Sequence, residues 1–355
     1  MKKNLCFVVS IIILSLFSFG IEIEIIKDPK PTCFEKNVQY EPLKKYKEIS
    51  NEDDESETFI ALARSVTADR SGNIFLFDGV FCEIFKYDKN LVFQGRFGGK
   101  GKGPGEFATH RGSGGVNLNI SGKNRLYAQD YKNRRITVFS LKGDYIIDYK
   151  TEYKFTFNPA QDIDGNLYIP SENGGVIDIF NSKMELTGVL LDVKEFRSFL
   201  FYEPVPAFKI VYSSPYWRNF RYDLLDGNRL LVYIRNSSTI YLLENRKLKK
   251  KLNIWPEKII KGYKAELFEL YQKNDDAFIN FSVNFFIDGD DNNFFYIQFG
   301  EDRARKIVPV YKFDLNGDLQ KIFYIKRTGG SITIFQCKRN NTFYTIKEGS
   351  LVLYK

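Results

Sequence analysis

The chain has 355 residues, of which 43% are hydrophobic and 27% charged, and its formal net charge is +8. These proportions are typical of a folded globular protein and exclude disorder and collagen-like repetition. With 33 Phe, 22 Tyr and 2 Trp against 2 Met, the composition suits pleated sheets better than helices. An all-β fold is therefore favoured over the two domains that the length alone suggests.

Residues 1–20 have the features of a signal peptide. Two lysines precede an uncharged apolar run, and Ser18 and Gly20 place small residues at the −3 and −1 positions of a cleavage site before Ile21. The run is short for a membrane helix, and an uncleaved anchor is the alternative. We expect an exported chain, periplasmic or extracellular, with no membrane span after cleavage. Loss of the two lysines takes the formal net charge from +8 to +6.

Neither the charges nor the cysteines of the mature chain identify a partner. Basic and acidic residues are interspersed, so nucleic-acid binding is not predicted. The dense basic segment 246–251 is typical of a solvated hairpin tip and, as the alternative, could bind a polyanion. Cys33, Cys82 and Cys337 leave at least one thiol unpaired, which rules out a disulfide framework but leaves their pairing open.

One structural unit recurs six times along the chain. Each unit begins with a turn rich in Gly, Asn and Asp, and an apolar or aromatic strand follows it. A charged hairpin then joins a third and a fourth strand in five of the units. The turns are centred on Gly72, Gly122, Gly165, Gly227, Gly289 and Asn340, and the strands that follow them are 74–77, 125–127, 167–169, 230–233, 294–297 and 342–344. These spacings suit four-stranded propeller blades with insertions.

The sixth unit stops after 350–354 without an outer strand. A ring with that gap would expose a row of unpaired backbone amides and carbonyls. Residues 43–49, which precede the first unit, can supply the missing strand. The sequence therefore predicts a six-bladed β-propeller over residues 43–355, closed by an N-terminal strand and preceded by an N-terminal arm at 21–42.

Two segments in the first two units carry a family resemblance. Gly103-Pro-Gly-Glu-Phe107, followed by Asp130-Tyr-Lys-Asn-Arg134, resembles NHL-repeat six-bladed β-propellers. Exported proteins of this kind, with a signal peptide and a single propeller, resemble a bacterial group of undefined function. The resemblance implies the fold and gives no substrate.

Two motifs in this region have a structural and a functional interpretation. Residues 98–105 are rich in glycine, but they lack the Ser or Thr after Gly-Lys that a phosphate-binding loop needs, so we interpret them as the crossover from blade one to blade two. Asp130 with Asn133 and Arg134 could form a catalytic group. Because Asp78 stands at the matching place in blade one, we interpret these aspartates as turn residues that accept backbone amides.

Signals for a cofactor or an enzyme are weak, and none is predicted. His110 is the only histidine, which leaves little for a zinc site or a Ser-His pair. The acidic segment 288–293 lacks the spacing of a calcium loop and coincides with a repeat turn. The alternative to a binding function is nevertheless a hydrolase or lyase with a carboxylate-bound divalent cation in the propeller channel.

Two insertions, at 195–222 and 257–282, are the candidate recognition elements. Both connect the outer strand of one blade to the inner strand of the next, so they should share one face of the ring. The first is rich in aromatic residues and arginine, which are common in binding sites but which could equally cap the core. The candidate ligand-binding residues are Tyr202, Phe208, Tyr212, Tyr216, Trp217 and Arg218. We expect an exported binding module for an unknown protein, peptide or glycan ligand of the cell envelope; a purely structural envelope component is a further possibility.

Overall fold

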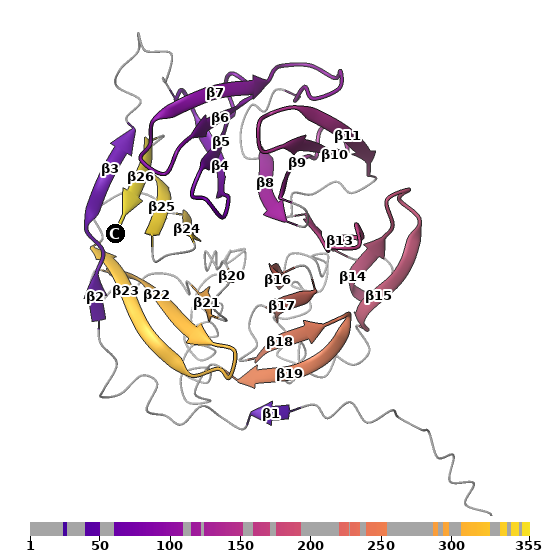
Figure 1. Ribbon diagram of the computed structural model, residues 1–355, viewed down its shortest axis with the longest axis vertical. Helices are drawn as coiled ribbons and strands as arrows, with labels where there is room; N and C mark the ends of the chain where they lie inside the picture. Colours follow the sequence, from indigo (N-terminus) through magenta and orange to yellow (C-terminus); the bar gives the residue numbers. More distant parts are fainter. Residues whose placement is uncertain are drawn as a thin grey trace, which may run out of the picture.

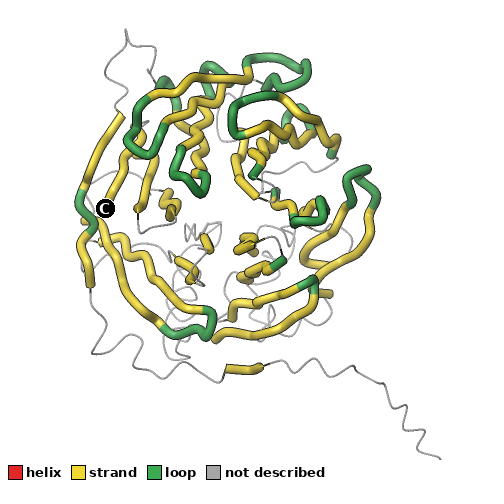
Figure 2. The backbone as a smooth tube through the Cα atoms, in the orientation of Figure 1, coloured by secondary structure: helices red, strands yellow, loops and turns green. Residues whose placement is uncertain are grey.

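The described part of the chain consists of strands and turns arranged as a ring. The computed structural model describes residues 24–26, 40–49, 60–108, 115–121, 124–151, 159–170, 175–192, 220–226, 228–234, 239–253, 287–289, 294–297, 307–326, 334–338, 342–347 and 350–355. These residues contain no helix, and hence none that could cross a membrane. Their strands form six small sheets around a central axis (Figures 1 and 2). The predicted all-β, six-bladed β-propeller is confirmed.

The strands of each blade follow one another from the axis outward. Blade one contains β4 (Ala63–Ala68), β5 (Ile74–Asp78), β6 (Glu83–Tyr87) and β7 (Phe93–Gly98). Blade two contains β8 (Val116–Ser121), β9 (Arg125–Asp130), β10 (Arg135–Ser140) and β11 (Tyr145–Lys150). Blade three contains β12 (Ala160–Gln161), β13 (Leu167–Pro170), β14 (Gly175–Phe180) and β15 (Leu186–Asp192).

The second half of the ring repeats this order. Blade four contains β16 (Phe220–Asp226), β17 (Arg229–Ile234), β18 (Thr239–Glu244) and β19 (Lys247–Asn253). Blade five contains β20 (Ile287–Gly289), β21 (Phe294–Ile297), β22 (Ile307–Asp314) and β23 (Leu319–Lys326). Blade six contains β24 (Ile334–Lys338), β25 (Thr342–Lys347) and β26 (Ser350–Tyr354), with β3 (Lys45–Ile49) as its outer strand. The six strands predicted after the Gly/Asn turns are therefore the second strands of the six blades.

The ring is closed by the N-terminal strand, as predicted. β3 pairs antiparallel with β26, with Leu351 opposite Ile49. Lys44 and Lys355 exchange both of their backbone hydrogen bonds, at 2.8 and 3.0 Å. The inner strands contact one another in ring order, and β24 of blade six contacts β4 of blade one. This pairing covers the edge that the C-terminal unit would otherwise expose.

The core lies between the blades, not within them. Six hydrophobic clusters occupy the six spaces between neighbouring blades. Between blades one and two, for example, Phe75 and Phe77 pack with Leu126 and Phe139, and all four side chains are buried. Alternate residues of each strand face opposite neighbours, which is why the aromatic-rich strands are buried on both sides.

Antiparallel pairing gives the ring two different faces. In blade one, Ala63, Asp78, Glu83 and Gly98 lie side by side at one end of the four strands. That end carries the turns between second and third strands and the links from one blade to the next, and we call it the link face. The opposite end carries the remaining turns of each blade, and we call it the turn face.

Turns on the turn face are built by short polar side chains. In four of the outer hairpins the first turn residue accepts backbone N–H groups two and four residues further on: Asp88, Ser140, Asn181 and Asp314. Asp69 and Asp162 accept the backbone N–H of Asn73 and Asn166 in the turns between first and second strands, both at 2.8 Å. Such local bonds explain why these polar segments form tight turns.

The N-terminal arm adds a fifth strand to two blades. β1 (Glu24–Ile26) pairs parallel with β19 of blade four, and β2 (Tyr40–Pro42) pairs parallel with β23 of blade five. Glu41 of β2 forms an ion pair with Lys321 of β23. Figure 1 shows the arm strands on the outside of the ring, leading to β3. The arm therefore covers the outer edges of blades four and five.

A β-bulge recurs at the same place in the outer strand of every blade. Each bulge leaves one residue of the outer strand unpaired with its neighbour: Gln94, Ile146, Thr187, Lys249, Gln320 and Tyr46. All six residues are exposed. Bulges increase the local twist of the strand that contains them.

Candidate functional site

The link face carries the longest connections of the ring. Residues 193–219 connect β15 to β16, and residues 254–286 connect β19 to β20, so both connections start and end on this face. Both lie outside the described residues, as does nearly all of the predicted insertions at 195–222 and 257–282. Only 220–222 are described, and they begin β16. The candidate residues Tyr202, Phe208, Tyr212, Tyr216, Trp217 and Arg218 also lie outside the described residues.

The glycine-rich link between blades one and two forms a compact loop on the link face. Gly101 donates its backbone N–H to Phe107 O at 2.9 Å, and Phe107 donates to Gly99 O at 2.7 Å. The Glu106 carboxylate accepts the Gly103 N–H at 2.7 Å. A Cβ added to Gly101 would overlap the Glu106 carboxylate, so a larger residue there would displace that side chain. The predicted crossover is confirmed, and its glycines serve close packing.

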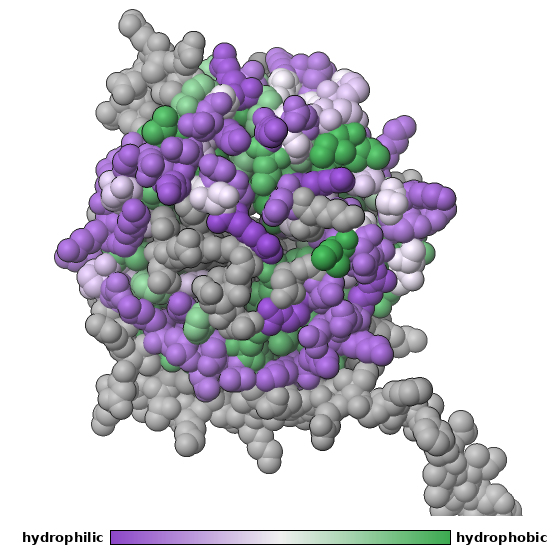
Figure 3. All heavy atoms as spheres, in the orientation of Figure 1, coloured by the Kyte–Doolittle hydropathy of each residue, from purple (hydrophilic) through white to green (hydrophobic). Residues whose placement is uncertain are grey.

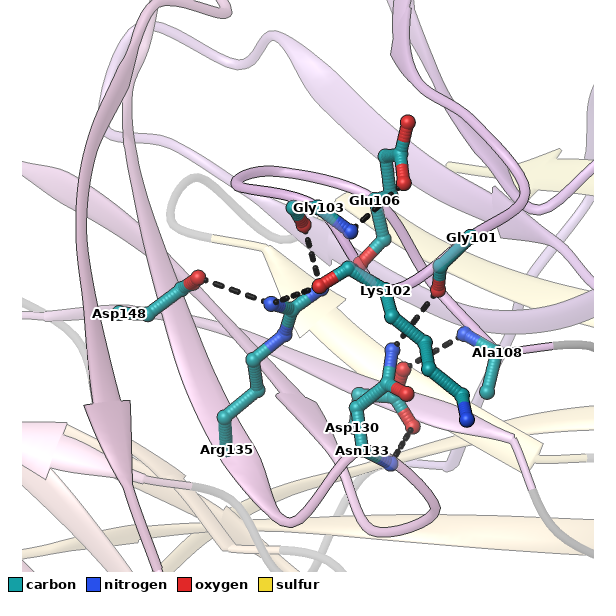
Figure 4. A network of polar contacts seen from close by, with 9 residues as sticks. All are labelled: Gly101, Lys102, Gly103, Glu106, Ala108, Asp130, Asn133, Arg135 and Asp148. Carbon is teal, nitrogen blue, oxygen red and sulfur yellow. Dashed lines mark hydrogen bonds and ion pairs between the residues drawn. The ribbon is translucent and has the colours of Figure 1, made fainter.

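A buried arginine holds this loop against blade two (Figure 4). Arg135, at the start of β10, pairs with Asp148 of β11, with Nη1 3.0 Å from Oδ2. The same guanidinium donates to the backbone carbonyls of Lys102, Gly103 and Glu106. Only 10% of the Arg135 side chain is exposed. The Arg135 side chain therefore connects β10, β11 and the link, and it fixes the loop against blade two.

Asp130 fixes the neighbouring turn, and Asp78 does the same in blade one. Asp130 Oδ1 accepts the N–H groups of Lys132 and Asn133, and its Oδ2 accepts the Ala108 N–H from the link at 2.8 Å. Asp78 accepts the N–H groups of Val80, Phe81 and Leu62 in the same pattern. Both carboxylates are fully buried. The interpretation of these aspartates as turn residues is confirmed, and neither is available as a catalytic base.

The two adjoining loops present positive charge to solvent. Lys100 and Lys102 of the link and Lys132 and Arg134 of the turn are exposed. The loops touch, because Asn133 donates its side-chain N–H to Gly101 O at 3.0 Å. The two carboxylates in these loops, those of Glu106 and Asp130, both accept backbone N–H groups. We call these four exposed cations the basic loop pair.

Exposed apolar side chains lie beside the basic loop pair. Val80 and Phe81, in the turn of blade one, are 53% and 37% exposed. The link begins at this turn, since the Gly99 N–H bonds to Cys82 O at 3.0 Å. The link face thus combines cations, an aromatic ring and an aliphatic side chain on loops fixed by buried contacts. Such a combination suits recognition of a partly apolar, acidic ligand.

Inner-strand side chains satisfy backbone groups across the blade boundaries near the channel. Ser65 of β4 accepts the N–H of Leu118 in β8 at 2.9 Å, and Ser121 of β8 accepts the N–H of Gln161 in β12 at 2.8 Å. In the part of the chain that the structure describes, no three His, Cys, Asp or Glu residues lie together as a metal site requires. Residues 288–289 of the acidic segment 288–293 end β20, and its residues 290–293 are outside the described ranges.

The basic loop pair was not predicted from the sequence. Its residues are separated by about 30 positions, and only the contact between link and turn brings them together. The role of Arg135 was also missed, because Glu83 occupies its place in blade one. The available signal was an alignment of the turns at Asp78 and Asp130, which places Glu83 and Arg135 at equivalent positions opposite these aspartates.

Comparison with known proteins adds the following findings. No protein-family model matches the chain, and no curated protein matches it. A protein from Bacteroides fragilis, described provisionally as exported, is similar in structure at 10% identity and a TM-score of 0.47, covering 83% of this chain and 89% of its own. A catalytically inactive virginiamycin B lyase from Staphylococcus aureus is similar at 10% identity and a TM-score of 0.43, covering 88% of this chain and 98% of its own. A streptogramin B lyase is similar at 8% identity and a TM-score of 0.43, covering 82% and 78%.

Proposed function

We propose that this chain is an exported binding module that recognises an acidic, partly apolar ligand of the cell envelope on its link face. The ligand is a protein, a peptide or a glycan. Export rests on the signal-peptide features of residues 1–20. The observation that carries the proposed binding surface is that the basic loop pair lies on the face of the closed ring at which both long connections start and end.

Positive charge on fixed loops favours binding of acidic ligands for a physical reason. Arg135 and Asp130 hold the loops in place, so little conformational entropy is lost when a ligand orders their exposed ends. Cations on one surface also raise the rate of encounter with an oppositely charged partner. Because the charges are exposed, binding should weaken as salt increases.

Both tryptophans of the chain provide a specific probe of this surface. Trp217 lies in the connection 193–219 and Trp255 in 254–286. Intrinsic tryptophan fluorescence therefore reports on these two connections alone. Titration with dextran sulfate, a soluble polyanion, should change the fluorescence at low salt, whereas uncharged dextran should leave it unchanged.

Charge-reversal variants test whether the link face is the binding surface. The pair Lys100→Glu and Lys102→Glu should weaken dextran sulfate binding by about tenfold. The matched control is Lys142→Glu with Lys183→Glu, which makes the same charge change in exposed hairpins of the turn face. Equal weakening by both pairs would mean that net charge alone drives binding and would reject the proposed surface.

A substitution in the first long connection tests its part in binding. Trp217→Ala should weaken binding by about 2 kcal/mol, the scale of an interface hot spot, with an unchanged melting temperature. If Trp217 instead caps the core, the same change should lower the stability of the fold by about 3 kcal/mol. Thermal denaturation therefore separates the two roles before the natural ligand is known.

A further inference from the structure

The outer edge of blade two differs from the edges of the other blades. At the bulge of β11, three consecutive apolar residues are exposed: Tyr145, Ile146 and Ile147 are 43%, 39% and 38% exposed. The two residues that correspond to Ile146 and Ile147, which are the bulge residue and the residue after it, differ in the other blades. They are Gln94-Gly95, Thr187-Gly188, Lys249-Lys250 and Gln320-Lys321 in blades one, three, four and five. These places hold polar or small residues, although β15 of blade three also exposes Leu186 and Val189 on either side of its bulge.

Blade six has an aromatic bulge residue, but a cation covers it. Lys355 Nζ lies 3.8 Å from the centroid of the Tyr46 ring, and Lys47 Nζ lies 5.8 Å from it. A cation above the ring satisfies its negative face. Aliphatic side chains such as Ile146 and Ile147 have no comparable interaction with a charge. Among the described outer strands, β11 is thus the one that exposes three consecutive apolar side chains.

The backbone of this edge is also open. β11 is the last strand of its sheet among the described residues, whereas β19 and β23 each carry an added arm strand. The ring therefore accepts an extra strand at an outer edge in two places. Figure 3 shows a hydrophobic patch at the rim, over the position of β10 and β11 in Figure 1. An open, apolar edge strand is a template for pairing with another strand.

Charges at the two ends of this edge match its own copy. Asp144 is exposed just before Tyr145, and Lys150 is exposed at the end of β11. When two such strands pair antiparallel about a two-fold axis, the start of each strand meets the end of the other. Asp144 of one copy then lies near Lys150 of the second copy, at both ends, while the isoleucines meet at the centre. Like charges would meet only in a parallel arrangement.

We propose that two copies of this chain associate through the outer edges of their second blades, with the β11 strands antiparallel. The contact extends the sheet of one blade two into that of the other. Because a strand edge is small compared with a standard interface, the dimer forms at high protein concentration and dissociates on dilution. The link faces of both copies stay accessible, since the contact lies on the rim.

Sedimentation velocity over a range of protein concentrations tests this association. The wild-type protein should change from monomer to dimer as concentration rises. Ile146→Lys with Ile147→Lys, which introduces the residues that blade four has at these positions, should raise the dissociation constant by at least about tenfold. A monomer at every concentration, or a dimer that the double variant leaves intact, would overturn the proposal.

Charge exchange distinguishes this contact from general stickiness. Asp144→Lys and Lys150→Asp should each weaken the dimer, because each places like charges together. The double variant Asp144→Lys with Lys150→Asp should restore it, and failure to restore it would overturn the antiparallel arrangement. Val189→Lys, on the exposed edge of blade three, is the control and should leave the dimer unchanged. An unchanged melting temperature verifies that each variant is folded.

Discussion

Blades one and two use the same ion-pair position with opposite charges. Glu83 on the third strand pairs with Arg96 on the fourth at 3.3 Å in blade one, whereas Arg135 pairs with Asp148 in blade two. The positions are equivalent, because Glu83 faces Gly98 and Arg135 faces Lys150 in the two registers. Only an arginine on the third strand has enough donors to reach the carbonyls of the link as well. The reversal therefore allows blade two to hold the link.

This arrangement predicts a large loss of stability when Arg135 is replaced. Arg135→Met removes four hydrogen bonds and leaves Asp148 without its partner, so the free energy of unfolding should fall by about 3 kcal/mol. Urea denaturation measures this loss. The control Arg134→Met alters the exposed neighbour and should change the free energy by less than about 0.5 kcal/mol. Similar values for the two variants would show that Arg135 contributes no more than a surface residue.

Buried tyrosines predict unfolding at high pH. Burial, with the nearby Asp162 carboxylate, raises the pKa of Tyr168 from 10.0 to about 12. Burial also raises the pKa of Tyr87, Tyr127 and Tyr241. The folded state then holds protons that the unfolded state loses above pH 10.0, so the stability present below that pH is lost as pH rises toward about 12. Tyrosinate absorbance and circular dichroism should change together over this range.

A single substitution checks the contribution of Tyr168. Tyr168→Phe removes the titrating group together with its 3.0 Å hydrogen bond to Asp162. The variant should be less stable at neutral pH, and its stability should fall less steeply between pH 10 and about 12 than that of the wild type. An identical slope in both proteins would mean that Tyr168 does not contribute to alkaline unfolding.

At the scale of elements, the N-terminal segments differ in what they cover. β3 completes a blade, whereas β1 and β2 lie outside blades that already have four strands. Deletion of residues 43–50 should therefore lower the melting temperature strongly or cause aggregation, because it opens the edge of β26. Deletion of residues 21–39, which removes β1 alone, should leave the ring folded. Thermal denaturation and light scattering of both variants make the comparison, and equal melting temperatures would contradict the role of β3.

The sequence predicted the repeating strands well because each carries a local signal. The Gly/Asn turns before β5 and β13, for example, contain glycines with positive φ at Gly72 and Gly165. The closing strand was predicted from the missing edge, and its observed start is Lys45. The strands β1 and β2 were not predicted, since three residues contain no periodic pattern and their partners lie more than 200 residues further along the chain.

The face on which the long connections start and end was predicted from the sequence, but the described residues of the proposed binding surface were not. The lengths of the blade-to-blade connections indicated which face is enlarged, because antiparallel blades place every such connection at the same end. Which described residues are exposed there depends on contacts between loops, such as the bond from Asn133 to Gly101. No periodicity within one strand encodes such a contact. The candidate aromatic residues of 195–222 remain predictions.

For the whole molecule, the two faces have different structural constraints. The turn face consists of short turns whose side chains bond to their own backbone, which leaves little freedom in length. Connections between blades on the link face vary in length from the short segment 327–333 to the long segments 193–219 and 254–286. Variation in the length of connections can therefore occur on the link face without disturbing the six inter-blade clusters.

Closure by β3 also determines the order in which the ring can fold. Strands of blades one to five come from continuous stretches of chain, whereas blade six joins residues 45–49 to residues 350–354. Contacts between residues so far apart form slowly, since a very long loop must close first. In pulsed hydrogen exchange during refolding, amides of β3 and β26 should gain protection after those of β9 and β10. Simultaneous protection would show that the ends meet early.

The same closure has a consequence for a growing chain. The segment that becomes β3 is synthesised before β4 to β25, and its partner β26, residues 350–354, follows them. Throughout that interval the first segment has no strand to pair with, and the unfinished ring has an open edge at each new blade. The segment of β3 must therefore stay unpaired until β26 has been synthesised. A factor that shields this extended segment during the interval would raise the yield of closed rings.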